Sequence, residues 1–467
     1  MIRSDLTICA PASGSGGAIS VIRVSGKDAF EIVSKVFFPS DNTVNILTIS
    51  GFRVVYGEIR SGDEVIDEVL VSIFRSPHSY TGENSAEISC HASPYIVKSI
   101  LELLIKNGAS AARPGEFTQR AFLNGQLDLS QAEAVADVIS SSSGVAHKIA
   151  MNQLRGGFSG EISNLRAELL NFASLIELEL DFGEEDVEFA DRGDLKAIIV
   201  RVKNLTDRLS ESFSLGNALK NGIPVVIVGK PNSGKSTLLN VLLQDDKAIV
   251  SDIPGTTRDT IEDTIVIDGI EYRFIDTAGL RETTDVIESL GIRKTFEKIA
   301  QASVILLVDE ITDSPDQING RIKAIREKID GTDKKLIILI NKSDTSDYNL
   351  QGELSKRITR EAGEKLLFIS AREKVGLDGL RSILSESVAV SGLSLENVMV
   401  TNARHYEALC KVSVSLGRVL NGLEENITED LIATDIRQAI HYLGEITGEI
   451  TSDEILGNIF RNFCIGK

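Results

Sequence analysis

The chain has 467 residues, of which 42% are hydrophobic and 25% charged, and its formal net charge is −19 at pH 7. This composition is that of an ordinary globular protein, and the length predicts about three domains at roughly 150 residues each. The negative charge excludes a surface that is basic overall, so binding to a nucleic acid would need a local basic patch or a second protein.

The sequence shows no sign of a membrane span, a secretory signal or a zinc site. Its apolar runs are far shorter than the roughly 18–20 residues that cross a bilayer, and its first residues lack an apolar core. We therefore expect a cytoplasmic protein with no membrane anchor. The four cysteines, Cys9, Cys90, Cys410 and Cys464, lack the spacing of metal ligands, and so do the five histidines.

The first part of the chain is predicted to be rich in strands and then to become helical. Apolar patterning predicts strands at 18–26, 52–59 and 68–74 and a helix at 93–108. From about residue 119 the pattern is helical, with a helix cap expected at Asp128 or Ser130. The acidic stretch 177–194 is interpreted as a solvated loop between helices, and a metal site built from its carboxylates is the alternative.

The middle of the chain has the pattern of a parallel α/β sheet. Residues 223–384 alternate apolar strands with helical segments, and after 395 the chain is helical again. This order predicts an α/β domain inserted into a helical domain.

The segment VVIVGKPNSGKST at 225–237 predicts a phosphate-binding loop. An apolar strand leads into Gly229-x4-Gly234-Lys235-Ser236, and an apolar helix follows. The glycines let backbone N–H groups point at phosphates, Lys235 reaches the β and γ oxygens, and the Ser236 hydroxyl binds Mg²⁺.

Further motifs, each after an apolar strand, complete a nucleotide site. In YRFIDTAG, Asp276 can hold Mg²⁺ through water and the Gly279 N–H can meet the γ-phosphate. In LIILINKSD, the Asp344 carboxylate can accept from guanine N1–H and the 2-amino group, whereas adenine would leave it unpaired. The backbone of Ser370 and Ala371 in LLFISAR is expected near the same base. Together these motifs predict a GTPase.

The group that orients the attacking water differs from the usual one. Ras-like GTPases have a glutamine directly after the DTAG glycine, but the residue here is Leu280. Glu288 is the candidate replacement, because it lies in the same segment. The Asn232 amide can either coordinate a monovalent cation in place of an arginine finger or simply fit the turn.

Long segments outside these motifs also match a known family. They are TGENSAEISCHAS (81–93), RPGEFTQRAFLNGQLDLSQAEAVADVI (113–139), SDIPGTTRD (251–259) and EITGEITSDEILGNIFRNFCIGK (445–467). With the nucleotide motifs, they make the whole chain resemble the tRNA uridine-modifying GTPases of the MnmE (TrmE) family. The resemblance implies an α/β plus α architecture of three domains. These are an N-terminal α+β folate-binding and dimerisation domain at 1–119, a discontinuous helical domain at 120–216 and 385–467, and an inserted Ras-like P-loop GTPase domain at 217–384.

The resemblance also implies a reaction and its partners. Such proteins form homodimers and work with an FAD-containing partner, MnmG (GidA), in a heterotetramer or larger complex. Together they place an aminomethyl or carboxymethylaminomethyl group on C5 of the wobble uridine of tRNA. A reduced folate, 5-formyl- or 5,10-methylene-tetrahydrofolate, supplies the one-carbon unit. GTP hydrolysis is expected to need Mg²⁺ and to be stimulated by potassium.

The resemblance assigns roles to individual residues. Mg²⁺ is held by Ser236 and Thr257, and water is oriented by Glu288. Potassium is held by Asn232, Ser251, Ile253 and Thr256. The residues expected to bind GTP are Asn232, Ser233, Gly234, Lys235, Ser236, Thr237, Ser251, Asp252, Ile253, Pro254, Gly255, Thr256, Thr257, Asp276, Thr277, Ala278, Gly279, Asn341, Lys342, Ser343, Asp344, Ser370, Ala371 and Arg372.

The folate site is expected at Arg23, Glu87, Gln126 and Lys467. Gln126 departs from the family, which usually has Lys or Arg there, so one charge-assisted contact to the anionic folate tail is expected to be missing. The resemblance places Cys464 near the folate, where its thiol either acts as a nucleophile or proton donor or only fills space.

A regulatory GTPase without modification chemistry, for instance in ribosome assembly, is the alternative function. The two functions share the nucleotide motifs and differ in the folate site, so binding of a reduced folate separates them.

Overall fold

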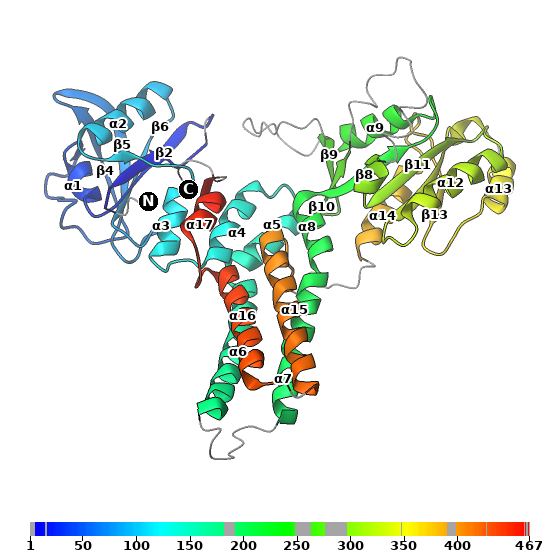
Figure 1. Ribbon diagram of the computed structural model, residues 1–467. Coiled ribbons are helices and arrows are strands. Elements are labelled where there is room, and N and C mark those ends of the chain that lie inside the picture. The colour runs from blue at the N-terminus through cyan, green and yellow to red at the C-terminus, as the bar shows by residue number, and fades with distance from the viewer. Residues whose placement is uncertain are drawn as a thin grey trace. The chain divides into compact units, whose positions relative to one another are not determined.

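A computed structural model of the chain describes residues 5–14, 16–181, 192–247, 263–275, 297–346, 348–389, 398–425, 427–461, 463 and 466. They fall into two compact units, each described here by itself (Figure 1). The first comprises Met1–Ser140, Ala150–Glu211 and Asn402–Lys467, and the second comprises Ser141–Ile149 and Ser212–Thr401.

The first unit begins with a seven-stranded sheet in the order β3-β4-β5-β6-β2-β1-β7. Its strands are β1 Ile8–Pro11, β2 Ile19–Ser25, β3 Phe37–Pro39, β4 Arg53–Ser61, β5 Glu64–Phe74, β6 Ser85–His91 and β7 Ser110–Ala111. Helices α1 Ala29–Ser34 and α2 Pro94–Lys106 cover one face, and α3 Glu116–Leu123 follows. The three predicted strands and the predicted helix at 93–108 are confirmed.

Period-two alternation explains how this sheet forms its core. In β4, Val55 and Ile59 are buried beneath the helices, whereas Val54 and Tyr56 point to the other face and are 63% and 50% exposed. One face of the sheet therefore packs against α1 and α2, and the opposite face is open and apolar at β4 and β5 but is covered by α3 at β1.

Long helices make up the rest of the first unit. They are α4 Leu129–Ser140, α6 Gly157–Asp181, α7 Arg192–Glu211, α15 Ala403–Glu424, α16 Glu429–Thr447 and α17 Asp453–Arg461, while α5 Gly144–Leu154 has residues in both units. Helix α15 packs against α7 and α16, and α16 packs against α6 (Figure 1).

The structure tests two predictions about where these helices begin and end. Of the two candidate caps for α4, Asp128 is confirmed: its Oδ1 accepts from the Gln131 N–H, and Gln131 Oε1 accepts from the Asp128 N–H. Ser130 is instead fully buried inside the helix. The predicted loop 177–194 was too long, because α6 continues to Asp181 and α7 begins at Arg192; residues 182–191 lie outside the described residues.

The second unit is a six-stranded sheet in the order β13-β12-β11-β8-β10-β9. The strands are β8 Ile223–Val228, β9 Asp263–Ile267, β10 Ile270–Phe274, β11 Val304–Glu310, β12 Lys335–Asn341 and β13 Lys365–Phe368. All pairs are parallel except β9 with β10, which confirms the predicted parallel sheet.

Helices cover both faces of this sheet, and apolar clusters fill both layers. The helices are α8 Phe213–Asn221, α9 Lys235–Lys247, α12 Pro315–Ile329, α13 Tyr348–Arg357 and α14 Leu377–Ala389, with a short 3₁₀ helix at Ser343–Thr345. Because parallel strands point the same way, the loops that follow β8, β11 and β12 meet at one edge. Among the described helices, none is long and apolar enough to cross a membrane.

Candidate functional site

The loop between β8 and α9 can be built only from glycine at two positions. Gly229 has φ 150° and Gly234 has φ 93°. A Cβ on Gly229 would lie 2.1 Å from the Val308 carbonyl oxygen, and one on Gly234 would lie 2.1 Å from Asn341 Nδ2. Asn232 has φ 63°, a left-handed conformation that Asn tolerates better than most residues. The loop that the sequence motif predicts is therefore packed closely against β11 and β12, the two strands next to β8 on that side of the sheet.

Lys235 is the first residue of α9, directly after this loop, and Ser236 follows it in the first turn of the helix. The Lys235 ammonium donates to the carbonyl oxygens of Gly229 at 3.0 Å and Lys230 at 2.6 Å. Burial lowers the Lys235 pKa, and the nearby Asp309 carboxyl opposes that shift. Thr237, one position further along α9, is exposed.

Asn341, the last residue of β12, joins three of the predicted motifs. Its side chain is buried; Nδ2 donates to the Ser233 carbonyl oxygen at 2.8 Å, and Oδ1 accepts from the Ala371 N–H at 3.0 Å. The loop after β8, the NKSD segment and the loop after β13 are therefore held together by one amide.

The remaining base-recognition residues follow Asn341 directly. Lys342 has φ 63° and its ammonium pairs with Glu310. Ser343 donates its N–H to the Ile369 carbonyl oxygen at 3.1 Å, and Asp344 lies in the 3₁₀ helix Ser343–Thr345.

In the loop after β13, Ser370 is buried and its Oγ accepts from the Glu373 N–H at 3.2 Å. The Arg372 side chain is 87% exposed, and its Nε lies 3.7 Å from Glu373 Oε1.

Many predicted site residues lie outside the described residues, and their placement stays a prediction. They are Ser251, Asp252, Ile253, Pro254, Gly255, Thr256, Thr257, Asp276, Thr277, Ala278, Gly279, Glu288, Cys464 and Lys467.

A group of acidic residues at the carboxyl end of β11 was not predicted from the sequence. Asp309 and Glu310 end β11, and Asp313 follows three residues later. Asp309 is fully buried, and burial raises its pKa to about 6 although Arg321 Nε lies 2.7 Å from its Oδ1. The signal was available, since acidic residues directly after a strand as apolar as VILLV are unusual.

In the first unit, Arg23 and Glu87 are directly opposite each other on β2 and β6. Arg23 Nε donates to Glu87 Oε1 at 2.8 Å, and its guanidinium carbon lies 5.0 Å from the Tyr80 ring centre and 5.6 Å from that of Phe117. Arg23 Nη1 also lies 3.4 Å from the Gly466 carbonyl oxygen, so Gly466 meets the second strand.

Gly466 is packed too tightly for any side chain. It has φ 95°, and a Cβ there would lie 1.9 Å from the Pro11 carbonyl oxygen of β1. Gln126 lies beside the same region, because a Cβ on Gly82 would be 3.2 Å from Gln126 Nε2. Arg23 and Glu87 are therefore brought together with Gly466, and Gln126 borders the loop that carries Tyr80.

The chain was compared with protein families and with curated relatives. A family model described as the MnmE helical domain matches residues 129–464, and one described as the GTP-binding protein TrmE N-terminus matches residues 7–126. Proteins named tRNA modification GTPase MnmE match over their length. The protein from Bacteroides thetaiotaomicron is 52% identical over 99% of both chains, and that from Flavobacterium psychrophilum is 53% identical over 100% of both.

Solved structures of GTP-binding proteins resemble part of the chain. The G domain of the T. maritima FeoB iron transporter is 25% identical, and the match covers 35% of this chain and 98% of that one with a TM-score of 0.25. A GTP-binding protein from Sulfolobus solfataricus in complex with GDP is 19% identical over 49% of this chain and 68% of that one, with a TM-score of 0.26.

Proposed function

The chain belongs to the MnmE family of tRNA modification GTPases, and from this membership we propose the chemistry that its own residues perform. It is a GTP-hydrolysing enzyme that acts in tRNA modification. We propose that, with an FAD-containing partner of the MnmG type, it adds an aminomethyl or carboxymethylaminomethyl group to C5 of the wobble uridine. A reduced folate would supply the one-carbon unit.

The loop after β8 is proposed to hold the GTP phosphates. The close approach of Gly229 and Gly234 to neighbouring atoms and the partly buried Lys235 ammonium support this role. The GTPase family implies Mg²⁺, and the hydroxyls of Ser236 and Thr257 are oxygen donors of the kind that this ion takes. Bound Mg²⁺ would offset the negative charge of the phosphates during hydrolysis.

Glu288 is proposed to orient the attacking water, because Leu280 has no polar group with which to do so. Potassium, held by Asn232 with Ser251, Ile253 and Thr256, would supply the positive charge that other GTPases take from an arginine. The conformation of Asn232 also favours a role in the turn, and the two roles are compatible.

The contacts that Arg23 makes with Glu87 and with Gly466 are the main support for the folate proposal. A pterin ring offers N–H donors to a carboxylate such as Glu87 and a flat face to aromatic rings such as Tyr80 and Phe117. Arg23, which is paired with Glu87, would lie at the same ring, and the anionic tail would suit Lys467, while Gln126 contributes a neutral amide. Cys464, two residues before Gly466, is proposed to act on the one-carbon unit, with packing as the alternative.

A homodimer is proposed through the open face of the first sheet. Val54 and Tyr56 of β4 and Leu70 of β5 are exposed on that face, and Val54 lies in the same row across the strands as Glu87 and Arg23. Apolar side chains gathered on a sheet face are stabilised when a second protein surface covers them.

Gly466→Ala tests the folate proposal directly. The added methyl group would clash with the Pro11 carbonyl oxygen and displace the chain terminus, so binding of 5-formyltetrahydrofolate and modified wobble uridine in tRNA should both fall. Gly457→Ala in α17 is the control, because its Cβ would meet nothing within 4 Å.

Fluorescence titration measures folate binding, and mass spectrometry of tRNA nucleosides measures modification. GTP hydrolysis should be unchanged in both variants. If the wild type binds no reduced folate and a deletion strain keeps normal wobble uridine, the regulatory GTPase is the correct function instead.

A further inference from the structure

Six charged side chains form a connected group at the carboxyl end of β11, here called the β11 charge cluster: Lys230, Asp309, Glu310, Asp313, Arg321 and Lys342. Glu310 is central, since Oε2 lies 2.6 Å from Lys230 Nζ and Oε1 accepts from Lys342 Nζ. Asp313 extends the group, with Oδ1 2.6 Å from Lys230 Nζ and Oδ2 2.6 Å from Arg321 Nη2. Glu310 therefore connects two lysines that come from different loops.

The order of the strands explains why Glu310 reaches both loops. Strand β11 lies between β8, which leads into the phosphate loop, and β12, which leads into the NKSD segment. Glu310 is the last residue of β11 and pairs in register with Asn341. Lys230 lies one residue after Gly229, and Lys342 lies one residue after Asn341.

The environment of Glu310 keeps it charged. Its side chain is 12% exposed, and burial pushes its pKa upward, but the hydrogen bonds from Lys230 and Lys342 outweigh burial and lower the pKa. A neutral group at this position would remove the carboxylate that attracts the Lys342 ammonium and would leave Lys230 paired with Asp313 alone.

The loops on either side each contain a non-glycine residue with positive φ. Asn232 and Lys342 both have φ 63°, a conformation that neighbouring contacts must maintain. Fixing a loop before its ligand arrives lowers the entropic cost of binding.

We propose that Glu310 is a positioning residue for the guanine nucleotide. Its carboxylate holds the phosphate loop through Lys230 and the base-recognition loop through Lys342, so that both are presented to one nucleotide together. The inference rests on the nucleotide site proposed above.

Glu310→Gln is the test, because it keeps the size of the side chain and removes its charge. Affinity for GDP and GTP, measured by calorimetry at low salt, should fall by the same factor of about tenfold, given that both lysines are partly exposed. The turnover number at saturating GTP should stay within about twofold, since the groups that act on the γ-phosphate are unchanged.

Glu364→Gln is the matched control. Glu364 accepts two hydrogen bonds from Arg326, at 2.8 and 2.5 Å, and a third from the Glu361 N–H at 2.8 Å, and its side chain is 9% exposed. It directly precedes β13 and so lies at the amino-terminal ends of the parallel strands, whereas Glu310 lies at their carboxyl-terminal ends. Both variants should lose some thermal stability, but only Glu310→Gln should lose nucleotide affinity. Glu310→Asp, which keeps the charge, should recover part of the lost affinity.

Three outcomes would overturn the inference. Normal GDP binding by Glu310→Gln refutes the positioning role alone. An equal loss of affinity in Glu364→Gln shows that general destabilisation is the cause. Failure of the wild type to bind GDP would refute the proposed nucleotide site and this inference together.

Discussion

At the scale of single residues, Asn341 shows why a recognition motif has a structural role as well. Its amide bonds to backbone groups of Ser233 and Ala371, which belong to two other loops. A buried amide with both ends satisfied fixes its partners more firmly than an exposed one. The position of Asp344, three residues later, therefore depends on a hydrogen-bonded framework as well as on its own segment.

Asp344→Asn should change the base that the enzyme prefers. The carboxylate accepts two N–H groups from guanine, whereas an amide also donates and suits the second carbonyl of xanthine. We expect the preference for GTP over XTP to fall by at least about 100-fold, as measured by competition binding. Asp378→Asn is the control, since that side chain is 99% exposed; an unchanged preference in Asp344→Asn would contradict the assignment.

Asn232→Gly should separate the two roles considered for Asn232. Glycine adopts φ 63° without strain, so the turn is kept while the amide oxygen is lost. If that oxygen binds potassium, the variant should hydrolyse GTP at the same slow rate in potassium and in sodium, whereas the wild type is faster in potassium. A variant that keeps its potassium stimulation would leave Asn232 with the turn role only.

At the scale of helices, one buried group of charges joins α4, α15 and α16. Glu133 of α4 accepts from Arg404 Nε and Nη2, each at 2.9 Å, and lies 2.7 Å from His405 Nε2. Arg404 also donates to the Glu445 carbonyl oxygen of α16 at 2.6 Å. Burial pushes the Glu133 pKa upward, but His405 and Arg404 outweigh it and lower this pKa to about 2.

Glu133→Gln should destabilise the first unit in a pH-dependent way. A carboxyl whose pKa is lowered on folding stabilises the folded state fully above its unfolded pKa, and this contribution is lost as pH falls towards 2. Urea unfolding at pH 7 should show a loss on the order of 3 kcal/mol, the usual result of breaking a buried ion pair. The difference from wild type should shrink between about pH 4.5 and 2.

Glu424→Gln is the control and should change little, because Glu424 of α15 forms only an exposed ion pair with Lys196 of α7. A pH-independent difference for Glu133→Gln would mean that packing, and not charge, accounts for the loss.

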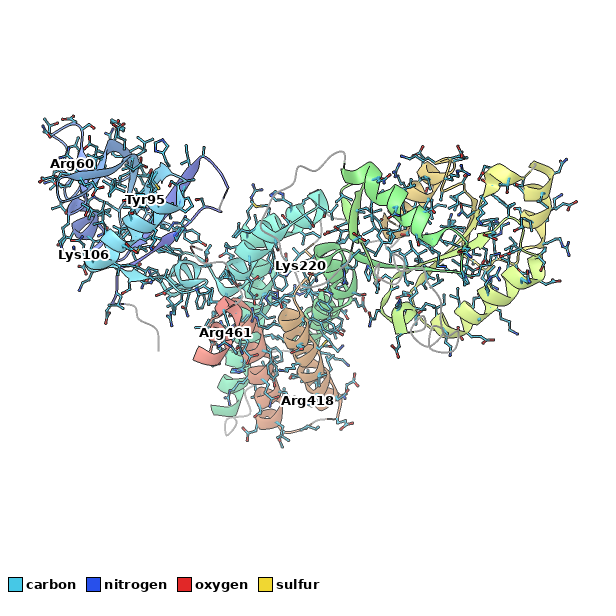
Figure 2. The ribbon with its side chains drawn as sticks, turned by 90° about the horizontal axis from the view of Figure 1, so that it is seen from above. Arg60, Tyr95, Lys106, Lys220, Arg418 and Arg461 are labelled. Atoms are coloured by element: carbon cyan, nitrogen blue, oxygen red, sulfur yellow. The ribbon has the colours of Figure 1, made fainter. Side chains whose placement is uncertain are left out.

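At the scale of the whole molecule, the open sheet face predicts self-association. Tyr56 of β4 is 50% exposed on that face, and Tyr95 of α2, labelled in Figure 2, is 64% exposed in the helical layer that covers the other face. Tyr56→Glu should convert a dimer into a monomer in light scattering, because a charge would be buried in the interface. Tyr95→Glu should remain a dimer, and monomers from both variants would point to general instability.

Prediction from the sequence succeeded where a structural element has a strong local pattern. Around 225–237, the glycines that predicted a phosphate-binding loop are the residues that the loop needs, because a Cβ at Gly229 or Gly234 would clash. The parallel strands were predicted correctly because they are continuous apolar runs. It failed at the acidic stretch, where α6 continues to Asp181, because a row of charged residues on a solvated helix looks the same as a loop.

The sequence alone therefore determined the family, the GTPase motifs and the order of strands and helices, because local backbone requirements and apolar periodicity are recorded in neighbouring residues. Only the tertiary structure decided which distant groups meet. Arg23 and Gly466 are 443 positions apart in the chain, yet Arg23 Nη1 lies 3.4 Å from the Gly466 carbonyl oxygen. Glu310 reaches Lys230 and Lys342 because β11 lies between β8 and β12. Such long-range contacts depend on strand order and register, which no single segment of the chain specifies.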